Sequence, residues 1–402
     1  MRRLTVCALA AGLAVMALSG RASAYPQFQF SSGTTRCSQC HYSPAGGGLI
    51  TSWGRDESGD TISLGGDGAF LHGLWTPPSW LALGADVRLA ALRNDVGGPE
   101  SPEYDFFPMQ ADLYGRVAFG DQVSLYLEGG VRGDARPADS SVGGRIDAIT
   151  DRFISREHYL MWRQAATGFY LRAGRFFAPY GLRFVEHTYY VRRYTGYDLY
   201  DETYTLSGGY LGEDWELHAS LFAPPPESFP NPLQSVGLRE SGGAVYAEKR
   251  LGGIAAVALQ ARVGSGAEAK RYEGGAVGKL WVEPARVLFM GEADFIHQQV
   301  SVASFSENQF VSYLGATFFP VRGLEAGLAY ERYQEDLSVA ATSQIIVQLE
   351  HEERCLGTLA GGARSDDLIL PEHDQLAVGP GEEVDLRVEA VARRAGHRQV
   401  LL

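Results

Sequence analysis

The stretch M-Q-A-D-L-Y-G-R-V-A-F-G-D-Q-V-S-L-Y-L-E-G-G-V-R, from Met109 to Arg132, contains the pattern that decides the fold class. Apolar side chains alternate with polar or charged ones over two runs, which the turn residues Gly120-Asp121 separate. Successive side chains of a β-strand point to opposite faces of a sheet. Each run therefore predicts a strand with one apolar and one polar face, on which Met109 and Leu113 lie opposite Asp112.

The same alternation continues from Trp80 to about residue 350. A soluble sandwich shows this alternation as well, with its apolar face in a core instead of against lipid. The expected strands run roughly ten to thirteen residues, which is long for a sandwich and suits a tilted membrane strand. Connections also alternate between short and long, as in outer-membrane barrels. The short ones lie at 120–121, 165–167, 212–214, 252–253, 284–285 and 320–323, and the longer ones at 134–152, 177–200, 224–238, 265–270, 300–308 and 335–340.

These features predict an all-β fold, an antiparallel transmembrane β-barrel of about 14 strands (alternative 16) over residues 80–350. An even number of strands puts both ends of the barrel at the short turns, on the periplasmic side. Residues 25–79 form a segment too small for a confident independent core, so we expect it to dock against the barrel or inside it as a plug. The outer surface of the barrel should contact outer-membrane lipid.

The composition favours a protein of strands and turns, and the net charge excludes a nucleic-acid-binding protein. Glycine (49) and tyrosine (20) are abundant, which favours strands and turns over a helical bundle. The formal net charge is −13. Nucleic-acid binding needs clustered Lys and Arg that displace counterions, so we expect no nucleic-acid partner.

The first 24 residues have the features of a cleaved export signal. Arg2 and Arg3 form the positive region, Thr5 to Leu18 is an uncharged apolar run, and Ala22-Ser23-Ala24 is a cleavage site. The mature chain should therefore begin at Tyr25. The apolar run is shorter than the ~20 residues of a membrane-spanning helix. We expect a protein of the cell outer membrane, exported by this signal peptide.

The mature N-terminal segment contains the motif C-S-Q-C-H at Cys37 to His41. Each thiol can add to one vinyl group of haem, and the histidine then serves as the proximal iron ligand. A redox dithiol would need a βαβ context, and a zinc site would need a second pair of ligands. The position directly behind an export signal favours haem, because c-type haem is attached outside the cytoplasm. The sequence therefore predicts one covalent haem c, with Cys37, Cys40 and His41 as the residues that bind it.

The flank of the motif reads H-Y-S-P-A-G-G-G-L-I-T-S-W-G-R, from His41 to Arg55. Its three glycines let the backbone approach a flat macrocycle, and an apolar wall could come from Pro44, Leu49, Ile50 and Trp53. The stretch resembles a group of bacterial outer-membrane proteins, the cytochrome c-containing porins, which carry one haem motif in front of a barrel. The resemblance covers about thirty residues closely and the barrel only in style, and it matches at Cys37, Cys40, His41, Pro44, Gly46 to Leu49, Gly54 and Arg55. It implies a haem-binding segment attached to a porin-like barrel.

The sixth iron position is open. His72 lies outside the expected strands and is the candidate distal ligand, whereas Met109 falls on the lipid-facing register. A five-coordinate haem is the alternative.

The leading hypothesis for function is electron transfer at the cell envelope, with periplasmic or extracellular cytochromes as partners. The first alternative is a porin for small solutes, with the haem segment as a plug or redox-sensitive gate. The second is a haem peroxidase-like enzyme. No Ser-His-Asp, paired-carboxylate or metal-hydrolase constellation supports other catalysis, so an electron carrier or porin is expected instead of an enzyme.

A second motif lies in the barrel region. The stretch 170–184 resembles a strand-end motif of phosphate-selective-type porins and belongs to the densest basic cluster of the chain, Arg172, Arg175, Arg183, Arg192 and Arg193. This cluster could form an anion-attracting constriction. We favour the alternative, in which the nearby Asp198, Asp201 and Glu202 balance its charge.

The last part of the chain differs from the barrel region in composition and in residue pattern. Residues 351–402 contain no Phe, Tyr or Trp, and the alternation stops. We interpret this tail as irregular, either a frame-shifted translation or a disordered appendage. Its residues Cys355, His351, His373 and His397 are therefore not interpreted as a metal site.

Overall fold

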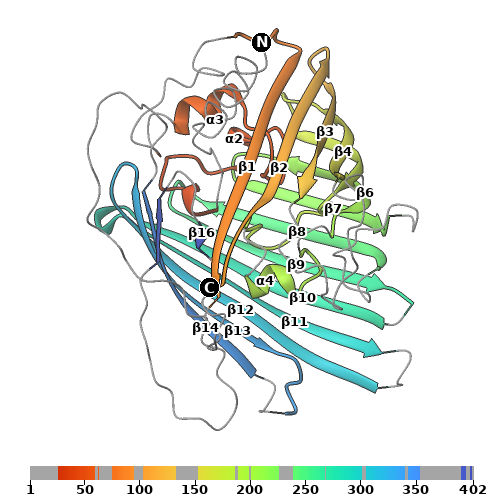
Figure 1. Cartoon of the computed structure of the whole chain (residues 1–402). Coiled ribbons are helices and arrows are strands. Elements are labelled where there is room, and N and C mark those ends of the chain that lie inside the picture. The colour runs from red at the N-terminus through yellow and green to blue at the C-terminus, as the bar shows by residue number, and fades with distance from the viewer. Residues whose placement is uncertain are drawn as a thin grey trace.

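The computed structural model describes the parts of the chain that form the sheet and the N-terminal segment, namely residues 26–58, 62, 75–94, 103–132, 153–185, 189–198, 201–225, 239–267, 269–300, 305–339, 343–353, 391–394 and 399–400. The helical elements are short: η1 Pro26–Phe28, α2 Cys37–Cys40, α3 Ser52–Glu57, α4 Tyr190–Arg193 and η5 Glu283–Ala285. Most other described residues belong to one strongly curved sheet (Figure 1).

The sheet is built by fourteen strands that follow one another in chain order, each antiparallel to the next. They are β1 Leu81–Asn94, β2 Glu103–Phe119, β3 Val123–Arg132, β4 Phe153–Arg163, β5 Phe169–Phe176, β6 Thr203–Leu211, β7 Trp215–Ala223, β8 Ser241–Leu251, β9 Ala255–Ser265, β10 Ala269–Val282, β11 Val287–Val300, β12 Phe305–Val321, β13 Leu324–Gln334 and β14 Ser343–Glu353. The antiparallel all-β fold and the count of about fourteen are thereby confirmed.

Two short strands from the C-terminal tail extend the edges of this sheet. Strand β15 (Val391–Arg394) pairs in parallel with β14, and β16 (Gln399–Val400) pairs in parallel with β1. Among the described residues, β1 and β14 do not pair with each other, so the sheet has two edges. Strand β14 continues three residues past the expected boundary at 350, because Glu353 still pairs with Leu324.

The connections alternate in length as the sequence predicts. The turns at one end of the sheet occupy a few residues each, while the connections at the other end include 177–202 and 224–240. The prediction of a long loop at residues 300–308 is wrong. Only residues 301–304 separate β11 from β12, because the pairing continues to Val300 and Phe305.

The two faces of the sheet have the reverse of the polarity found in soluble proteins. On β9, Leu259 is 70% exposed on the outer face, whereas its neighbour Gln260 is 5% exposed on the inner face. Strand β7 repeats this alternation, with Leu221 outside and Glu216 buried inside. A continuous exposed apolar surface around a charged interior is the arrangement of a membrane barrel. Leu113 and Asp112 on β2 lie on the outer and inner faces as predicted, while the side chain of Met109 is outside the described residues.

Exposed aromatic side chains gather near both ends of the strands. Those near the short turns are Trp80, Phe119, Trp162, Phe169, Trp215 and Phe318, and those towards the long loops are Phe153, Tyr204, Tyr272, Phe295 and Phe305. Exposed aliphatic residues such as Leu160 and Leu314 lie between the two groups. Amphipathic rings at both membrane–water interfaces are typical of membrane barrels. Within the described part of the chain, no helix is long and apolar enough to cross a membrane.

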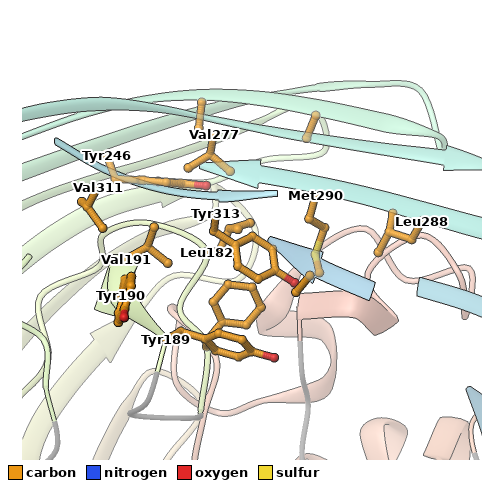
Figure 2. Close-up of a cluster of buried hydrophobic side chains, with 14 of the residues drawn as sticks. Leu182, Tyr189, Tyr190, Val191, Tyr246, Val277, Leu288, Met290, Val311 and Tyr313 are labelled. Atoms are coloured by element: carbon orange, nitrogen blue, oxygen red, sulfur yellow. The ribbon is translucent and has the colours of Figure 1, made fainter. Parts of the chain in front are cut away.

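The long connection after β5, which contains α4, folds onto the concave face of the sheet. The backbone N–H groups of Gly181 and Leu182 donate to Gln260 on β9 and Glu292 on β11, both at 2.8 Å. Figure 2 shows apolar residues of this connection packed against strands β8, β10, β11 and β12. This inner cluster includes Leu182, Tyr189, Tyr190, Val191, Tyr246, Val277, Leu288, Met290, Val311 and Tyr313. The main apolar core therefore lies inside the curved sheet.

Candidate functional site

The two cysteines occupy the ends of the one-turn helix α2. The side-chain oxygen of Gln39 accepts hydrogen bonds from the backbone N–H groups of Thr35 and Arg36, at 3.1 and 3.0 Å. This interaction closes the start of the turn, where the N–H groups of a helix have no partner of their own. The N–H of His41 then donates to the carbonyl of Cys37 at 3.0 Å. The turn therefore brings both thiols and the imidazole to one region.

Helix α3 packs directly on α2. The hydroxyl of Thr51 donates to the carbonyl of Gln39 at 2.9 Å and accepts from the N–H of Gly54 at 3.0 Å, so it also caps α3. A Cβ at Gly54 would lie 2.5 Å from the carbonyl oxygen of Cys40. This close approach gives a structural reason for the glycine of the motif's flank.

The three glycines after the motif form a tight return loop. Gly46, Gly47 and Gly48 have φ angles of 84°, 77° and 57°, a left-handed conformation that glycine adopts without steric cost. A Cβ at Gly48 would also collide with the hydroxyl of Tyr126 on β3. The loop brings the carbonyl of Gly47 to 2.7 Å from Nδ1 of His41.

His41 is 1% exposed, and its two ring nitrogens have different surroundings. Nδ1 donates its proton to the Gly47 carbonyl, since a carbonyl oxygen only accepts. Nε2 is buried and has no hydrogen-bond partner. Burial lowers the pKa of His41 to about 4, although the hydrogen bond to Gly47 opposes this shift, so the ring is neutral at pH 7. A neutral imidazole with one oriented N–H and one bare nitrogen is the form that ligates a metal.

Both cysteines are free thiols. Burial raises the pKa of the Cys37 thiol, and burial together with the neighbouring Cys37 raises the pKa of Cys40 to about 11. Redox-active cysteines have lowered pKa values. The surroundings of this pair therefore disfavour a redox dithiol.

A cavity opens beside these three residues. Its empty volume is about 620 Å³, which includes space open to solvent. The walls are apolar and basic in different parts. They include Cys37, Cys40 and His41 together with Phe28, Ile50, Leu182, Arg36 and Arg183. Leu182 and Arg183 belong to the connection after β5, so the barrel contributes to the cavity.

The N-terminal segment 26–58 contacts strands from both halves of the sheet. The N–H of Leu49 donates to the hydroxyl of Tyr126 on β3 at 3.2 Å, and Arg172 on β5 donates to Ser43 at 3.1 Å. On the other side, Lys279 of β10 donates to Gln29 at 2.6 Å. These contacts hold the segment on the concave face of the sheet, where Figure 1 shows α2 and α3.

The apolar wall expected around the motif is only partly correct. Ile50 lines the cavity. Leu49 instead packs against Tyr126 and Tyr159 of the sheet, and Trp53 is 43% exposed. The return loop turns Leu49 and Ile50 to opposite sides, which alternation along an extended segment produces.

The candidate distal ligand His72 lies outside the described residues, as do Cys355, His373 and His397. His351 is on β14. Among the residues that the structure describes, no group of three or more His, Cys, Asp and Glu side chains is arranged to hold a metal ion.

Within the basic cluster, Arg175 pairs with one of the three acids that were expected to balance it, whereas Arg183 pairs with an acid on β7. Arg175 contacts Glu202 at 3.6 Å, and Arg183 contacts Glu216 at 2.8 Å. Arg192 donates to backbone carbonyls of its own loop. Sequence reasoning did not place Arg183, Leu182 and Phe28 in the wall of the cavity. No local pattern could have identified them, since their position depends on an inward fold of a long connection.

Several solved structures are similar to this chain, and all are outer-membrane proteins. OprB of Pseudomonas putida has 12% identity over 66% of this chain and 84% of its own, with a TM-score of 0.46. The anion-selective porin from Comamonas acidovorans has 14% identity over 66% and 82%, with a TM-score of 0.42. The channel DcaP of Acinetobacter baumannii has 11% identity over 68% and 88%, with a TM-score of 0.41. No protein-family model and no curated protein matches the chain. Likeness at this level assigns neither a solute nor a partner.

Proposed function

We propose that the chain is an outer-membrane β-barrel protein that carries one covalent haem c on its N-terminal segment and takes part in electron transfer at the cell envelope. The observation that carries the proposal is the buried Nε2 of His41. It has no hydrogen-bond partner, and His41 lines the same cavity as Cys37 and Cys40. A buried polar atom without a partner costs free energy, and a bound haem iron would satisfy this one.

The two cysteines are in the reduced form that thioether bond formation with haem requires. In each thioether bond, the sulfur bonds one carbon of a vinyl group and the thiol hydrogen goes to the other carbon. No group leaves and no oxidant is consumed, so the reaction requires reduced cysteines. Cys37 and Cys40 are reduced and one helical turn apart.

The residues around His41 would hold the ligand in place. The carbonyl of Gly47 fixes the ring orientation and keeps the proton on Nδ1. Apolar residues from two parts of the chain, Phe28 and Leu182, line the cavity and would lie beside a bound haem. A bound haem would supply a one-electron redox couple, whose potential these surroundings tune.

The barrel's outer surface supports the membrane location. Side chains such as Leu113 and Leu259, 71% and 70% exposed, would be costly to solvate on a soluble protein of this size and are expected on a lipid-facing wall. One haem is unable to bridge a membrane alone. Periplasmic or extracellular cytochromes are therefore the proposed electron partners.

Haem-stained denaturing electrophoresis of outer-membrane fractions tests the proposal, in cells competent for haem attachment. Wild-type protein should give a stained band at the mature mass, and the Cys37→Ala, Cys40→Ala double variant should give none. Ser38→Ala changes the same helical turn but keeps both thiols, so it is the matched control and should stain. Absence of stain from wild type would reject the haem and leave a plain barrel.

A second candidate function is a porin for small solutes, with the N-terminal segment as plug or redox-sensitive gate. It is favoured by the charged inner face, where ion pairs such as Arg156–Glu202 and Arg262–Glu240 lie. Single-channel conductance distinguishes the two. Solute-permeable channels of equal conductance in wild type and in the haem-less double variant would favour the porin, and closed channels in both would favour the electron carrier.

A further inference from the structure

Arg183 is placed in the cavity wall by an unusual backbone conformation. Its φ angle is 60°, in the left-handed region that side-chain-bearing residues avoid. The preceding N–H groups of Gly181 and Leu182 are held by Gln260 and Glu292, which fixes the approach of the chain. Strained residues persist where the surrounding structure determines them, and they cluster at functional sites.

The guanidinium of Arg183 is only partly satisfied. Its Nη1 donates to Glu216 at 2.8 Å, and the group lies over the ring of Tyr246 at 4.9 Å. Its Nε and Nη2 atoms are buried and have no hydrogen-bond partner. A guanidinium has five donors in a fixed fork, a geometry that matches a carboxylate. The free side of Arg183 is therefore suited to a second anion.

The buried charges around Arg183 do not balance. Arg183 and Arg250 pair with Glu216, while Arg250 and Lys279 pair with Glu248. These described ion pairs contain three cations and two carboxylates, so one positive charge is in excess. His218, which hydrogen-bonds Glu216, adds no negative charge. A buried excess charge is costly unless a counter-charge is bound.

We propose that Arg183 binds a propionate carboxylate of the haem and thereby holds the midpoint potential of the iron at a higher value. This inference rests on the proposed function, because it needs a haem in the cavity that Cys37, Cys40 and His41 line. Haem carries two propionates, so the group supplies the carboxylate that the fork of Arg183 lacks. A buried cation beside the haem favours the reduced iron, which has one positive charge less.

Spectroelectrochemical titration of the folded, haem-loaded protein in detergent tests the proposal. Arg183→Gln should shift the redox equilibrium at least tenfold towards the oxidised form, a fall in midpoint potential of about 59 mV for one electron. Arg183→Lys keeps the positive charge and should retain most of the wild-type value. The matched control is Lys249→Gln, which removes an exposed cation paired with Asp214 at 2.9 Å, and it should leave the potential unchanged.

An unchanged potential in Arg183→Gln would overturn the proposal, as would equal falls in Arg183→Gln and Arg183→Lys. If Arg183→Gln fails to load haem, Glu216→Gln provides the complementary measurement. Removal of the carboxylate that competes for Arg183 should raise the potential, and an unchanged or lower value would overturn the proposal. Absence of haem from wild type would instead reject the proposed function itself.

Discussion

Tyr126 connects the barrel wall to the N-terminal segment through its hydroxyl group. That hydroxyl accepts the N–H of Leu49 at 3.2 Å and donates to Glu128 at 3.3 Å. In Tyr126→Phe the buried N–H of Leu49 loses its acceptor, which should cost about 1–3 kcal/mol. We expect the segment to detach from the wall more often, measured as faster proteolysis within residues 26–58 while the barrel stays folded.

The matched control for this change is Tyr330→Phe on the outer face of β13, where the ring is 38% exposed. It should leave proteolysis of the segment unaltered. Equal protection of the segment in wild type and Tyr126→Phe would show that the other contacts, from Arg172 and Lys279, hold it without the hydroxyl.

Titration of the buried Asp201 carboxyl should make the stability of the folded protein depend on pH. Burial, with Asp198 and Glu202 beside it, raises the pKa of Asp201 to about 7, whereas an unfolded Asp titrates near 3.9. Between these values the folded chain binds a proton that the unfolded chain has lost, so stability falls as the pH rises and the loss is complete above pH 7. Asp201→Asn removes this cost.

Asp201→Asn should therefore be more stable than wild type at pH 8, by at most about 4 kcal/mol at 1.36 kcal/mol per pH unit, and equal to it below pH 4. Thermal unfolding in detergent at the two pH values measures the difference. Asp214→Asn, at an exposed short turn, is the control and should show no such crossover. A gain of the same size at both pH values would contradict the electrostatic cause.

Single residues also show where sequence reasoning succeeds and where it stops. The C-x-x-C-H spacing predicted that Cys37, Cys40 and His41 act together, and all three line one cavity. Arg183 was recognised only as a member of a basic cluster. Its pairing with Glu216, thirty-three positions later, depends on the fold of the whole connection and not on any local pattern.

At the scale of elements, period-two alternation located the strands well, because each strand has to present one face to lipid and one to the interior. Strand β9 illustrates this relation, with every second side chain exposed. The pattern gives no information on connections. The inward fold of residues 177–185 and 189–198 requires partners such as Glu292 and Glu331 on distant strands, so the sequence could indicate the length of this connection and not its path.

Strand β9 also provides the test of the lipid-facing surface. Leu259 is 70% exposed near the middle of the strand. Leu259→Arg should cost about 2–4 kcal/mol if this position lies at the bilayer midplane, because a charge there enters hydrocarbon. We expect a clear fall in folded barrel in outer-membrane fractions, measured by heat-modifiable electrophoretic mobility.

Ser265→Arg is the control at the loop end of the same strand, where the expected cost is only about 0–1 kcal/mol. A soluble protein would give the opposite result, since replacing an exposed leucine with arginine on a water-facing surface is nearly neutral. Equal yields of the two variants would therefore reject a membrane-spanning sheet.

At the scale of the whole molecule, the N-terminal segment and the connection after β5 fill the concave side of one sheet. The sequence suggested docking of the segment, because it is too small to fold alone. The contacts that attach it, such as Gln29 with Lys279, join residues 250 positions apart and have no sequence signal. Measurements of solute passage show whether the docked segment closes the lumen.

Deletion of residues 26–58 tests the segment as a plug. In the part of the chain that the structure describes, strands β1 to β14 pair only among themselves and with β15 and β16, so the barrel should still assemble without the segment. Removal of the segment empties part of a charged interior, and water and ions should enter it. We expect larger single-channel conductance in planar bilayers and faster uptake of small hydrophilic solutes by cells.

The Cys37→Ala, Cys40→Ala variant is the control, because it loses the thiols proposed to bind haem but keeps the contacts of Tyr126, Arg172 and Lys279. Its conductance should equal that of wild type if the polypeptide alone blocks the lumen. Conductance that rises in this variant as much as in the deletion would mean that the haem, and not the chain, closes the channel. No rise in either would leave the connection after β5 as the barrier, since it occupies the same concave side through Gly181 and Leu182.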